Sequence, residues 1–464
     1  MQTREQTLRT RAQAAGQAHL FDHYAELEPR ARESFLDEVE SIDFELVAHF
    51  AKLLSAKDPQ GGGEIRPPDV FALRRDARAE ERAKRAHAAG EELLRQGRVG
   101  YVLVAGGQAS RLGYDGPKGA YRIGPVTDRS LFGWHASRLL AARNRYGRPV
   151  PWYVMTSPAN DAPTRAFFAE HDWFGLDRGD VFFFSQEMVP ALDFEGRILF
   201  SGPGRLFLSP NGHGGTLLAL ERSGALADAR RRGVEQLSYF QVDNPLAPPA
   251  DPLFLGLHLL ASAGMSSKVV AKRNAAEKVG VIGLVDGRTS CIEYSDLPAD
   301  AREARDARGE LLYGAGNIAM HVLDVGFVES LTTGGLKLPW HVARKSMNVW
   351  ERGVATQKQG AKFETFVFDA LPKSASSVTL EVARTHEFSP VKNASGEDSP
   401  ATCRADLCRL HAEWVAARGL PLPEPTGDGV HPVEIDPVLA DHREAFLRAP
   451  APKPRVDDKG HVYV

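Results

Sequence analysis

The sequence predicts an α/β fold: a doubly wound, mostly parallel sheet, with a helical N-terminal region and a small C-terminal domain. Strand-like and helix-like segments alternate from residue 98 onward, which is typical of helices covering both faces of one sheet. The run VGYVLVAGG is continuously apolar, as expected of a parallel strand that is buried on both faces. A chain of 464 residues also exceeds one ordinary core. We therefore expect three regions: 1–96, 97–380 and 381–464.

The N-terminal region is predicted to be helical over 17–55, with a turn at Pro29. Apolar residues recur there at spacings of three and four, which places them on one helix face; they are Phe35, Leu36, Val39, Ile42, Leu46, Val47, Phe50 and Leu53. The Gly/Pro-rich stretch 58–68 should break the helices, and charged helical sequence follows to about residue 96.

The central region is predicted from its alternating segments. Strands are expected at 98–107, 152–157, 180–186 and 237–244, and helices at 130–147 and 162–171, with Ser130 as an N-cap. The segments 268–272, 279–287 and 289–297 have tight turns between them and predict an antiparallel insertion. Beyond about residue 380 the sequence is Pro-rich and the alternation is lost.

Composition limits the partners that we expect. Lys and Arg number 57 against 60 Asp and Glu, a formal net charge of −3, which argues against binding nucleic acid or a membrane surface. The three cysteines are too few for a disulfide framework and favour a reducing compartment. The polar start and the absence of a long apolar run predict neither a signal peptide nor a membrane span. We expect a cytoplasmic protein that is a monomer or a homodimer.

The loop after the first central strand is the strongest functional signal. Gly106 and Gly107 leave the backbone N–H groups open to a phosphate, and Arg111 and Lys118 can neutralise it. The segment lacks the G-x-x-x-x-G-K-[ST] pattern of a P-loop and the G-x-G-x-x-G pattern of a dinucleotide site. A plain glycine turn with two surface charges is the alternative.

LVAGGQASRLGYDGPKG, residues 103–119, resembles the nucleotide loop of the eukaryotic-type UDP-sugar pyrophosphorylases, LxxGGxGTRLGxxxPKG. The resemblance is strongest to the UDP-N-acetylglucosamine enzymes and extends over about residues 15–415. Further matching segments follow in the same order; they include FFFSQEMVPAL, SPNGHGG, VDNPL, KVGVIGLVDG, IEYSDL, GAGNIAMH, FETFVFD and EFSPVKN. The resemblance implies a Rossmann-like nucleotide-diphospho-sugar transferase fold. It also implies that UTP and a sugar 1-phosphate give UDP-sugar and pyrophosphate.

The resemblance carries roles over to matching positions. Residues implied in catalysis are Arg111, Lys118 and Lys392. Residues implied in nucleotide binding are Val104, Ala105, Gly106, Gly107, Lys118, Gln186, Gly212, Asp243 and Lys362. Residues implied in sugar phosphate binding are His213, Glu293, Asn317 and Lys392. Asp243 ends a strand and is the expected ligand of Mg²⁺, with Mn²⁺ as an alternative; a simple turn residue is the other interpretation.

Three departures from the family pattern bear on specificity and geometry. His213 stands where the N-acetylglucosamine enzymes carry Asn and the UDP-glucose enzymes carry His. Ala109 replaces a glycine, so its backbone should avoid positive φ. Met320 replaces an Asn beside His321, whose transfer to the site is therefore uncertain. UDP-glucose, UDP-galactose or broad UDP-sugar synthesis remains an alternative, as does a silent UDP-sugar sensor.

Overall fold

The computed structural model describes residues 3–56, 63–450 and 453–464, and it divides into two compact units. Unit 1 comprises Met1–Gly62, Gln186–Thr216 and Lys337–Val367, and unit 2 comprises Gly63–Ser185, Leu217–Leu336 and Phe368–Val464. The expected boundaries at residues 96 and 380 do not coincide with these units. Among the described residues, no helix combines the length and apolar character that crossing a bilayer requires.

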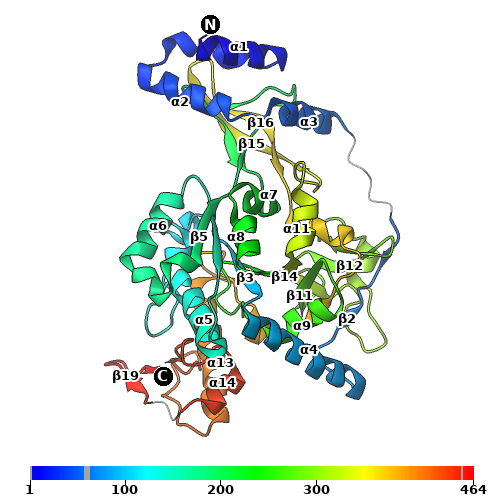
Figure 1. Cartoon of the computed structure of the whole chain (residues 1–464), viewed down its shortest axis with the longest axis vertical. Coiled ribbons are helices and arrows are strands. Elements are labelled where there is room, and N and C mark those ends of the chain that lie inside the picture. Colours follow the sequence, from blue (N-terminus) through cyan, green and yellow to red (C-terminus); the bar gives the residue numbers. More distant parts are fainter. Residues whose placement is uncertain (1–2, 57–62, 451–452) are drawn as a thin grey trace. The chain divides into compact units, whose positions relative to one another are not determined.

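Unit 2 is built on one large mixed sheet (Figure 1), whose main strands run in the order β2-β17-β11-β14-β10-β3-β4-β5. These strands are β2 (Val70–Phe71), β3 (Val99–Val104), β4 (Trp152–Thr156), β5 (Val181–Ser185), β10 (Gln236–Gln241), β11 (Met265–Ala271), β14 (Ala315–Asp324) and β17 (Thr379–Glu381). Within this order, β14 alone is antiparallel to its neighbours β10 and β11. The predicted doubly wound α/β class is confirmed.

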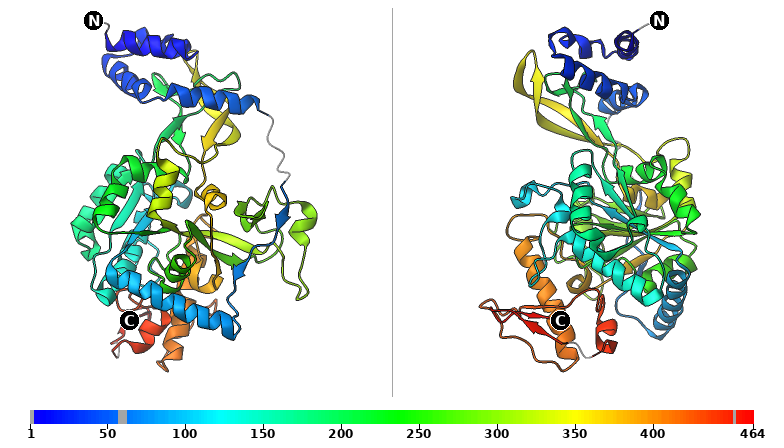
Figure 2. Two further views of the ribbon diagram at one scale, coloured as in Figure 1. Left: turned by 45° about the vertical axis from the view of Figure 1, so that its right-hand side comes forward. Right: turned by 60° about the vertical axis from the view of Figure 1, so that its left-hand side comes forward.

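Helices cover both faces of this sheet (Figure 2). Alternate residues of β4 face opposite ways: Trp152 packs on Phe168 of one helix layer, whereas the Tyr153 hydroxyl donates to Asp228 on the other face. The helices that lie wholly within unit 2 are α4 (Ala77–Gln96), α5 (Leu131–Tyr146), α6 (Asp161–Glu170), α8 (Ala225–Arg231), α9 (Pro252–Leu260), α10 (Ala299–Glu303), α11 (Val325–Thr332), α12 (Arg384–Glu387), α13 (Pro400–Ala417) and α14 (Arg443–Arg448). Helix α7 (Gly215–Arg222) spans the sequence boundary at Thr216.

The chain reverses its direction of travel across the sheet between β3 and β10. From β3 it proceeds outward through β4 to β5, and it later returns to form β10 on the other side of β3. The two strands are parallel, and Val104 pairs with Gln241 at their carboxyl ends. Such a switch point is where α/β sheets bind ligands, because the loops there diverge and leave a crevice.

Helix α4 belongs to the sheet unit because it packs closely against α9. A methyl group at Gly90 would lie 1.8 Å from the Pro252 carbonyl oxygen, and one at Gly256 would lie 1.7 Å from that of Ala86. The two helix backbones therefore touch through paired glycines. This contact explains why residues 63–96 do not group with the N-terminal helices.

Unit 1 combines N-terminal helices with short strands and a long hairpin (Figure 1). Its helices are α1 (Arg4–Ala14), α2 (Pro29–Glu40) and α3 (Phe44–Ser55), with 3-10 turns at Ala18–Phe21 and Tyr24–Glu26. Its strands are β6 (Met188–Pro190), β7 (Phe200–Gly202), β8 (Arg205–Leu206), β9 (Leu208–Pro210), β15 (His341–Glu351) and β16 (Val354–Glu364). The predicted helicity is confirmed for α2 and α3, whereas the expected helix before Pro29 consists of the two 3-10 turns, and Pro29 is the first residue of α2.

Distant segments share the core of unit 1. The ring of Phe50 on α3 stacks on Phe363 of β16 with centroids 3.9 Å apart. The buried Gln17 side chain donates to the Gly196 carbonyl and accepts from the Ile198 N–H, both at 2.9 Å. These contacts bring three separate stretches of sequence into one unit.

The predicted antiparallel insertion is confirmed in part. Strands β12 (Val281–Val285) and β13 (Arg288–Ile292) form a hairpin, turned by Asp286 and Gly287 with positive φ, whereas β11 is part of the main sheet. Strand β1 (Ile65–Arg66) pairs with β12. The part of the predicted helix break at 57–62 lies outside the described residues.

The C-terminal segment packs on the loop that follows the glycine-rich stretch. Strands β18 (Val433–Glu434), β19 (Arg455–Val456) and β20 (Val462–Tyr463) form a small sheet. The buried Glu434 carboxylate accepts from the N–H groups of Val126 and Thr127, at 2.8 and 3.0 Å, and from the Thr127 hydroxyl. This carboxylate fastens residues 126–127 to the C-terminal sheet.

Replacing this carboxylate should destabilise the protein. In Glu434→Gln the side-chain amide would face backbone donors, so we expect the free energy of unfolding to fall by about 2 kcal/mol. Urea unfolding measures the change, and Glu424→Gln, on an exposed loop residue, serves as the control. Equal stability of the two variants would contradict this role of Glu434.

Candidate active site

The glycine-rich segment forms a closed loop at the carboxyl end of β3. The Ala109 N–H donates to the Gly116 carbonyl and the Lys118 N–H donates to the Gly107 carbonyl, both at 3.1 Å. Ala109 is buried with φ of −95°, so the prediction that this position avoids positive φ is confirmed. Backbone hydrogen bonds therefore fix the loop from Gly107 to Lys118.

The first residues of the loop present unused backbone donors. Among the described residues, no group accepts a hydrogen bond from the N–H of Gly106, Gly107 or Gln108. A methyl group built at Gly107 would meet no neighbouring atom within 4 Å, so packing does not require a glycine there. Three adjacent backbone N–H groups are therefore available to bind an anion.

Two side chains outside the predicted set hold this loop from behind. The Ser157 hydroxyl donates to the Gly106 carbonyl at 2.9 Å, and the Asn160 amide donates to the carbonyls of Ala105 and Gly107 at 2.9 and 3.2 Å. Both residues follow β4 in the segment TSPAN. The signal in the sequence was an Asn that precedes a helix, which is usually interpreted as an N-cap.

Lys118 and Asp243 lie together at the switch point. Lys118 Nζ is 3.1 Å from Asp243 Oδ2, and the exposed fractions of the two side chains are 17% and 11%. The parallel pairing of β3 and β10 places the loop beside the residues that follow β10. Arg111 is exposed on the same loop, and no described residue pairs with its guanidinium group. The structure therefore brings together the loop and Asp243, two sites to which the resemblance gave nucleotide-binding roles.

Lys392 is carried to the end of β10 by a hydrogen-bonded segment. The Asn244 side chain donates to the Glu387 carbonyl at 2.7 Å and accepts from the Ser389 N–H at 3.1 Å. The Val391 N–H donates to the Asp243 carbonyl at 2.9 Å. Lys392 is the next residue, and its Nζ lies 3.9 Å from Asp398.

Glu293 and Asn317 meet around Gly280. The Asn317 N–H donates to the Gly280 carbonyl at 2.9 Å, and a methyl group at Gly280 would lie 3.5 Å from Glu293 Oε1. Because β14 is antiparallel to β10, its first residues, including Asn317, lie at the edge where β10 ends. Burial raises the pKa of the neighbouring Cys291 thiol, which favours its neutral form.

His321 does not belong to this edge. It is 1% exposed in the middle of β14, and its Nδ1 lies 2.9 Å from the Ser267 hydroxyl. Met320 is buried as well. His321 therefore lies in the core of the sheet, and its position gives no support for transferring it to the site.

The other predicted positions belong to unit 1. Gln186 is buried, Gly212 has φ of 80°, and Lys362 Nζ lies 5.0 Å from the centre of the Phe207 ring. His213 Nδ1 accepts from the Val367 N–H at 3.2 Å, which leaves Nε2 as the protonated ring nitrogen. Burial, with a smaller contribution from His341, lowers the pKa of His213 to about 4.

The described residues contain no group of three or more His, Cys, Asp or Glu side chains placed to hold a metal ion. Asp243 is a single, partly accessible carboxylate beside free backbone donors. One carboxylate fits a hard cation that takes its other ligands from water and phosphate oxygens. It does not fit a metal bound by the protein alone.

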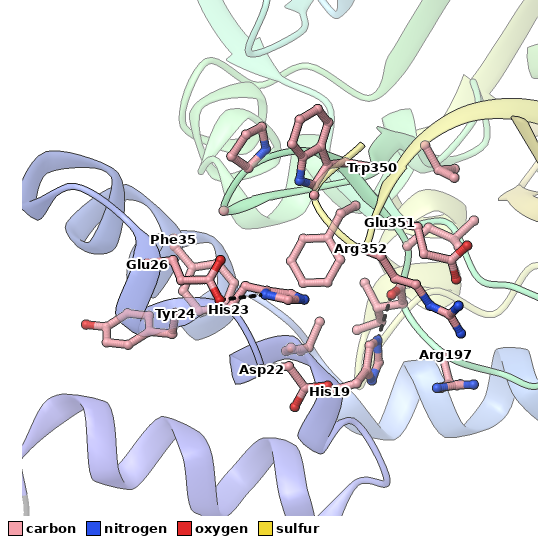
Figure 3. A pocket seen from close by; sticks show the side chains of 18 of the residues that line it. His19, Asp22, His23, Tyr24, Glu26, Phe35, Arg197, Trp350, Glu351 and Arg352 are labelled. Atoms are coloured by element: carbon pink, nitrogen blue, oxygen red, sulfur yellow. Dashed lines mark hydrogen bonds and ion pairs between the residues drawn. The ribbon is translucent and has the colours of Figure 1, made fainter. Parts of the chain in front are cut away.

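Unit 1 contains a separate cavity of about 600 Å³ (Figure 3). Residues 19–27, the loop 193–204 and the tip of the β15–β16 hairpin line it, and none of the predicted site residues does. Several of its charges are paired internally: Lys358 with Asp193 and Glu351, and His23 with Glu26. We therefore do not assign the predicted chemistry to this cavity.

Comparison with known proteins agrees with the sequence motifs. A sequence model of the family described as UTP--glucose-1-phosphate uridylyltransferase matches residues 50–415. The human UDP-N-acetylhexosamine pyrophosphorylase-like protein 1 is 36% identical over 94% of this chain and 93% of its own length. The UDP-N-acetylglucosamine pyrophosphorylase of Saccharomyces cerevisiae is 33% identical over 87% of this chain and 90% of its own.

A solved structure extends the similarity to three dimensions. The uridine diphosphate N-acetylglucosamine pyrophosphorylase of Trypanosoma brucei, in complex with an inhibitor, has a TM-score of 0.82 and 27% identity. The match covers 97% of this chain and 95% of that one. The chain therefore belongs to the UTP--glucose-1-phosphate uridylyltransferase family of nucleotidyltransferases.

Proposed function

We propose that this protein transfers the uridylyl group of UTP to a sugar 1-phosphate, giving UDP-sugar and pyrophosphate. The observation that supports this most directly is the row of three free N–H groups at residues 106–108, beside Lys118 at the switch point of the sheet. Such a site suits a polyphosphate, because backbone dipoles and a fixed cation both favour negative charge. Arg111 lies on the same loop and adds a second cation.

The reaction requires charge neutralisation more than acid–base chemistry. An oxygen of the sugar phosphate forms a bond to the α-phosphorus of UTP, and the bond from that phosphorus to the bridging oxygen breaks. Pyrophosphate leaves with the electron pair. Since the sugar phosphate is already ionised at neutral pH, the protein's contribution is to orient two anions and offset their repulsion. Lys118 and Arg111 do this on the loop side, and Lys392 approaches from the segment tied to β10.

We propose that Asp243 holds Mg²⁺ when the nucleotide is bound, and Mn²⁺ could replace it. The ion would supply positive charge to the phosphate oxygens. The Asp243 carboxylate would then bind this ion, and the ammonium group of Lys118, which now pairs with Asp243, would bind a phosphate oxygen.

We propose N-acetylglucosamine 1-phosphate as the preferred sugar phosphate. Two of the relatives reported above are named UDP-N-acetylglucosamine pyrophosphorylases, although the family description names glucose 1-phosphate. His213 is the residue that keeps UDP-glucose or UDP-galactose as the second candidate. Glu293 and Asn317 supply acceptor and amide groups of the kind that ring hydroxyls bind.

A panel assay tests the proposal. With UTP and Mg²⁺, we expect pyrophosphate release with N-acetylglucosamine 1-phosphate to exceed that with glucose or galactose 1-phosphate, measured as kcat/KM. A higher kcat/KM with glucose 1-phosphate would show that glucose 1-phosphate is the preferred substrate. Binding of UTP without pyrophosphate release from any of the three would indicate a sensor rather than an enzyme.

Removing either charged group at the switch point should slow turnover strongly. We expect Lys118→Ala and Asp243→Ala each to lower kcat/KM by about 100-fold or more, the scale of losing one partner of the transition-state charge. Lys84→Ala, on an exposed face of α4, is the matched control and should keep full activity. Activity near the wild-type level in both site variants would place the reaction elsewhere.

His213 should act as a neutral group. Its pKa is lowered to about 4, so the ring is protonated only below that pH and stays uncharged from about pH 5.5 to 8. The pH profile of kcat/KM should therefore have the same shape in the wild type and in His213→Asn. An ionisation near pH 6.5 that disappears in the variant would contradict a neutral His213.

A further inference from the structure

The carbonyl groups behind the phosphate-binding face are all held by side chains. Asn160 binds those of Ala105 and Gly107, and Ser157 binds that of Gly106. These are three consecutive peptide groups, and the described residues contain no cis peptide bond. In a trans peptide the carbonyl of one residue and the N–H of the next point in opposite directions. Fixing these three carbonyls therefore directs the N–H groups of residues 106–108 the other way.

Asn160 is itself rigidly held. Its side chain is fully buried, and its Oδ1 accepts from the Ser157 N–H at 2.8 Å. Asn160 Oδ1 also lies 3.1 Å from the Ser157 hydroxyl, whose single hydrogen is shared with the Gly106 carbonyl. Both the amide and the oxygen of Asn160 are thus engaged. A buried polar group with all its hydrogen bonds made has one orientation, because any rotation would leave a buried donor or acceptor unpaired.

The Asn160 side chain does not cap helix α6, although its position would allow it. It occupies the N-cap position of α6, where an Asn side chain ordinarily accepts from the N–H groups of the first turn. Here it makes no such bond to its own helix and points to the glycine loop instead. The stability of α6 therefore does not account for this residue, whereas the loop does.

We propose that Asn160 and Ser157 are positioning residues, which aim the backbone donors of Gly106, Gly107 and Gln108 at the phosphates of UTP. They act through the loop and touch no substrate. This inference rests on the proposed function, since it assigns the loop to the nucleotide. We therefore expect substitutions of Asn160 or Ser157 to weaken the binding of UTP more than the binding of the sugar 1-phosphate.

The sharpest variant is Asn160→Asp. It keeps the shape and the acceptor for Ser157, but a carboxylate has no hydrogen to donate and repels the carbonyls of Ala105 and Gly107. We expect kcat/KM for UTP to fall by about 100-fold, the scale of losing an oriented backbone donor. The KM for the sugar 1-phosphate should change less than about threefold. Ser157→Ala should lower kcat/KM for UTP less, and Ser157→Thr, which keeps the hydroxyl, should restore it.

Thr164→Val is the matched control. Thr164 lies on α6, is as fully buried as Asn160, and its hydroxyl has no hydrogen-bond partner among the described residues. This variant should keep wild-type kinetics. If Asn160→Asp does not fold, the comparison of kcat/KM for UTP between Ser157→Ala and Ser157→Thr tests the positioning role instead.

Two results would overturn the inference. One is a folded Asn160→Asp that binds UTP as tightly as the wild type does, measured by calorimetry. The other is an equal loss for UTP and sugar phosphate that follows the fall in melting temperature, which would indicate a purely structural role. Calorimetry with UTP needs no turnover, so failure of the proposed reaction, seen as no pyrophosphate release by the wild type, is distinguishable from failure of the positioning role.

Discussion

The parallel pairing of β3 with β10 is the constraint on which the site depends. It places the carboxyl ends of two strands, distant in sequence, side by side, so that Lys118 on one loop reaches Asp243 on the other. The antiparallel course of β14 then brings Asn317 to the same edge. Because the sheet fixes these backbones, the polar groups need no further element to bring them together.

The local part of the fold could be predicted from the sequence, and the long-range part could not. Continuous apolar runs identified β3 and β4, and Ser130 was identified as the N-cap of α5, where its hydroxyl accepts from the Gly133 N–H. The grouping into two units depends instead on contacts such as Phe50 with Phe363, which no local pattern encodes. The long β15–β16 hairpin was missed for a related reason: much of it is exposed, so it lacks an apolar alternation.

The site shows the same division. The glycine loop and Asp243 carry compact motifs, and the family resemblance implied that both bind the nucleotide. Asn160 carried the pattern of a helix cap, so only the structure reveals that its amide turns to the loop. The burial of His321 could not be predicted from its motif, because the alternation of side chains along a strand decides which of them is buried. The nucleotide roles of Gln186, Gly212 and Lys362 stay predictions.

A crystal structure with bound UTP would show directly whether the glycine loop holds the phosphates. We expect phosphate oxygens within hydrogen-bond distance of the N–H groups of Gly106, Gly107 and Gln108, with Lys118 Nζ on the same triphosphate. We also expect the carbonyls of Ala105 and Gly107 to keep their bonds to Asn160. A triphosphate bound away from these N–H groups, with the loop unchanged and empty, would show that the loop is not the phosphate site.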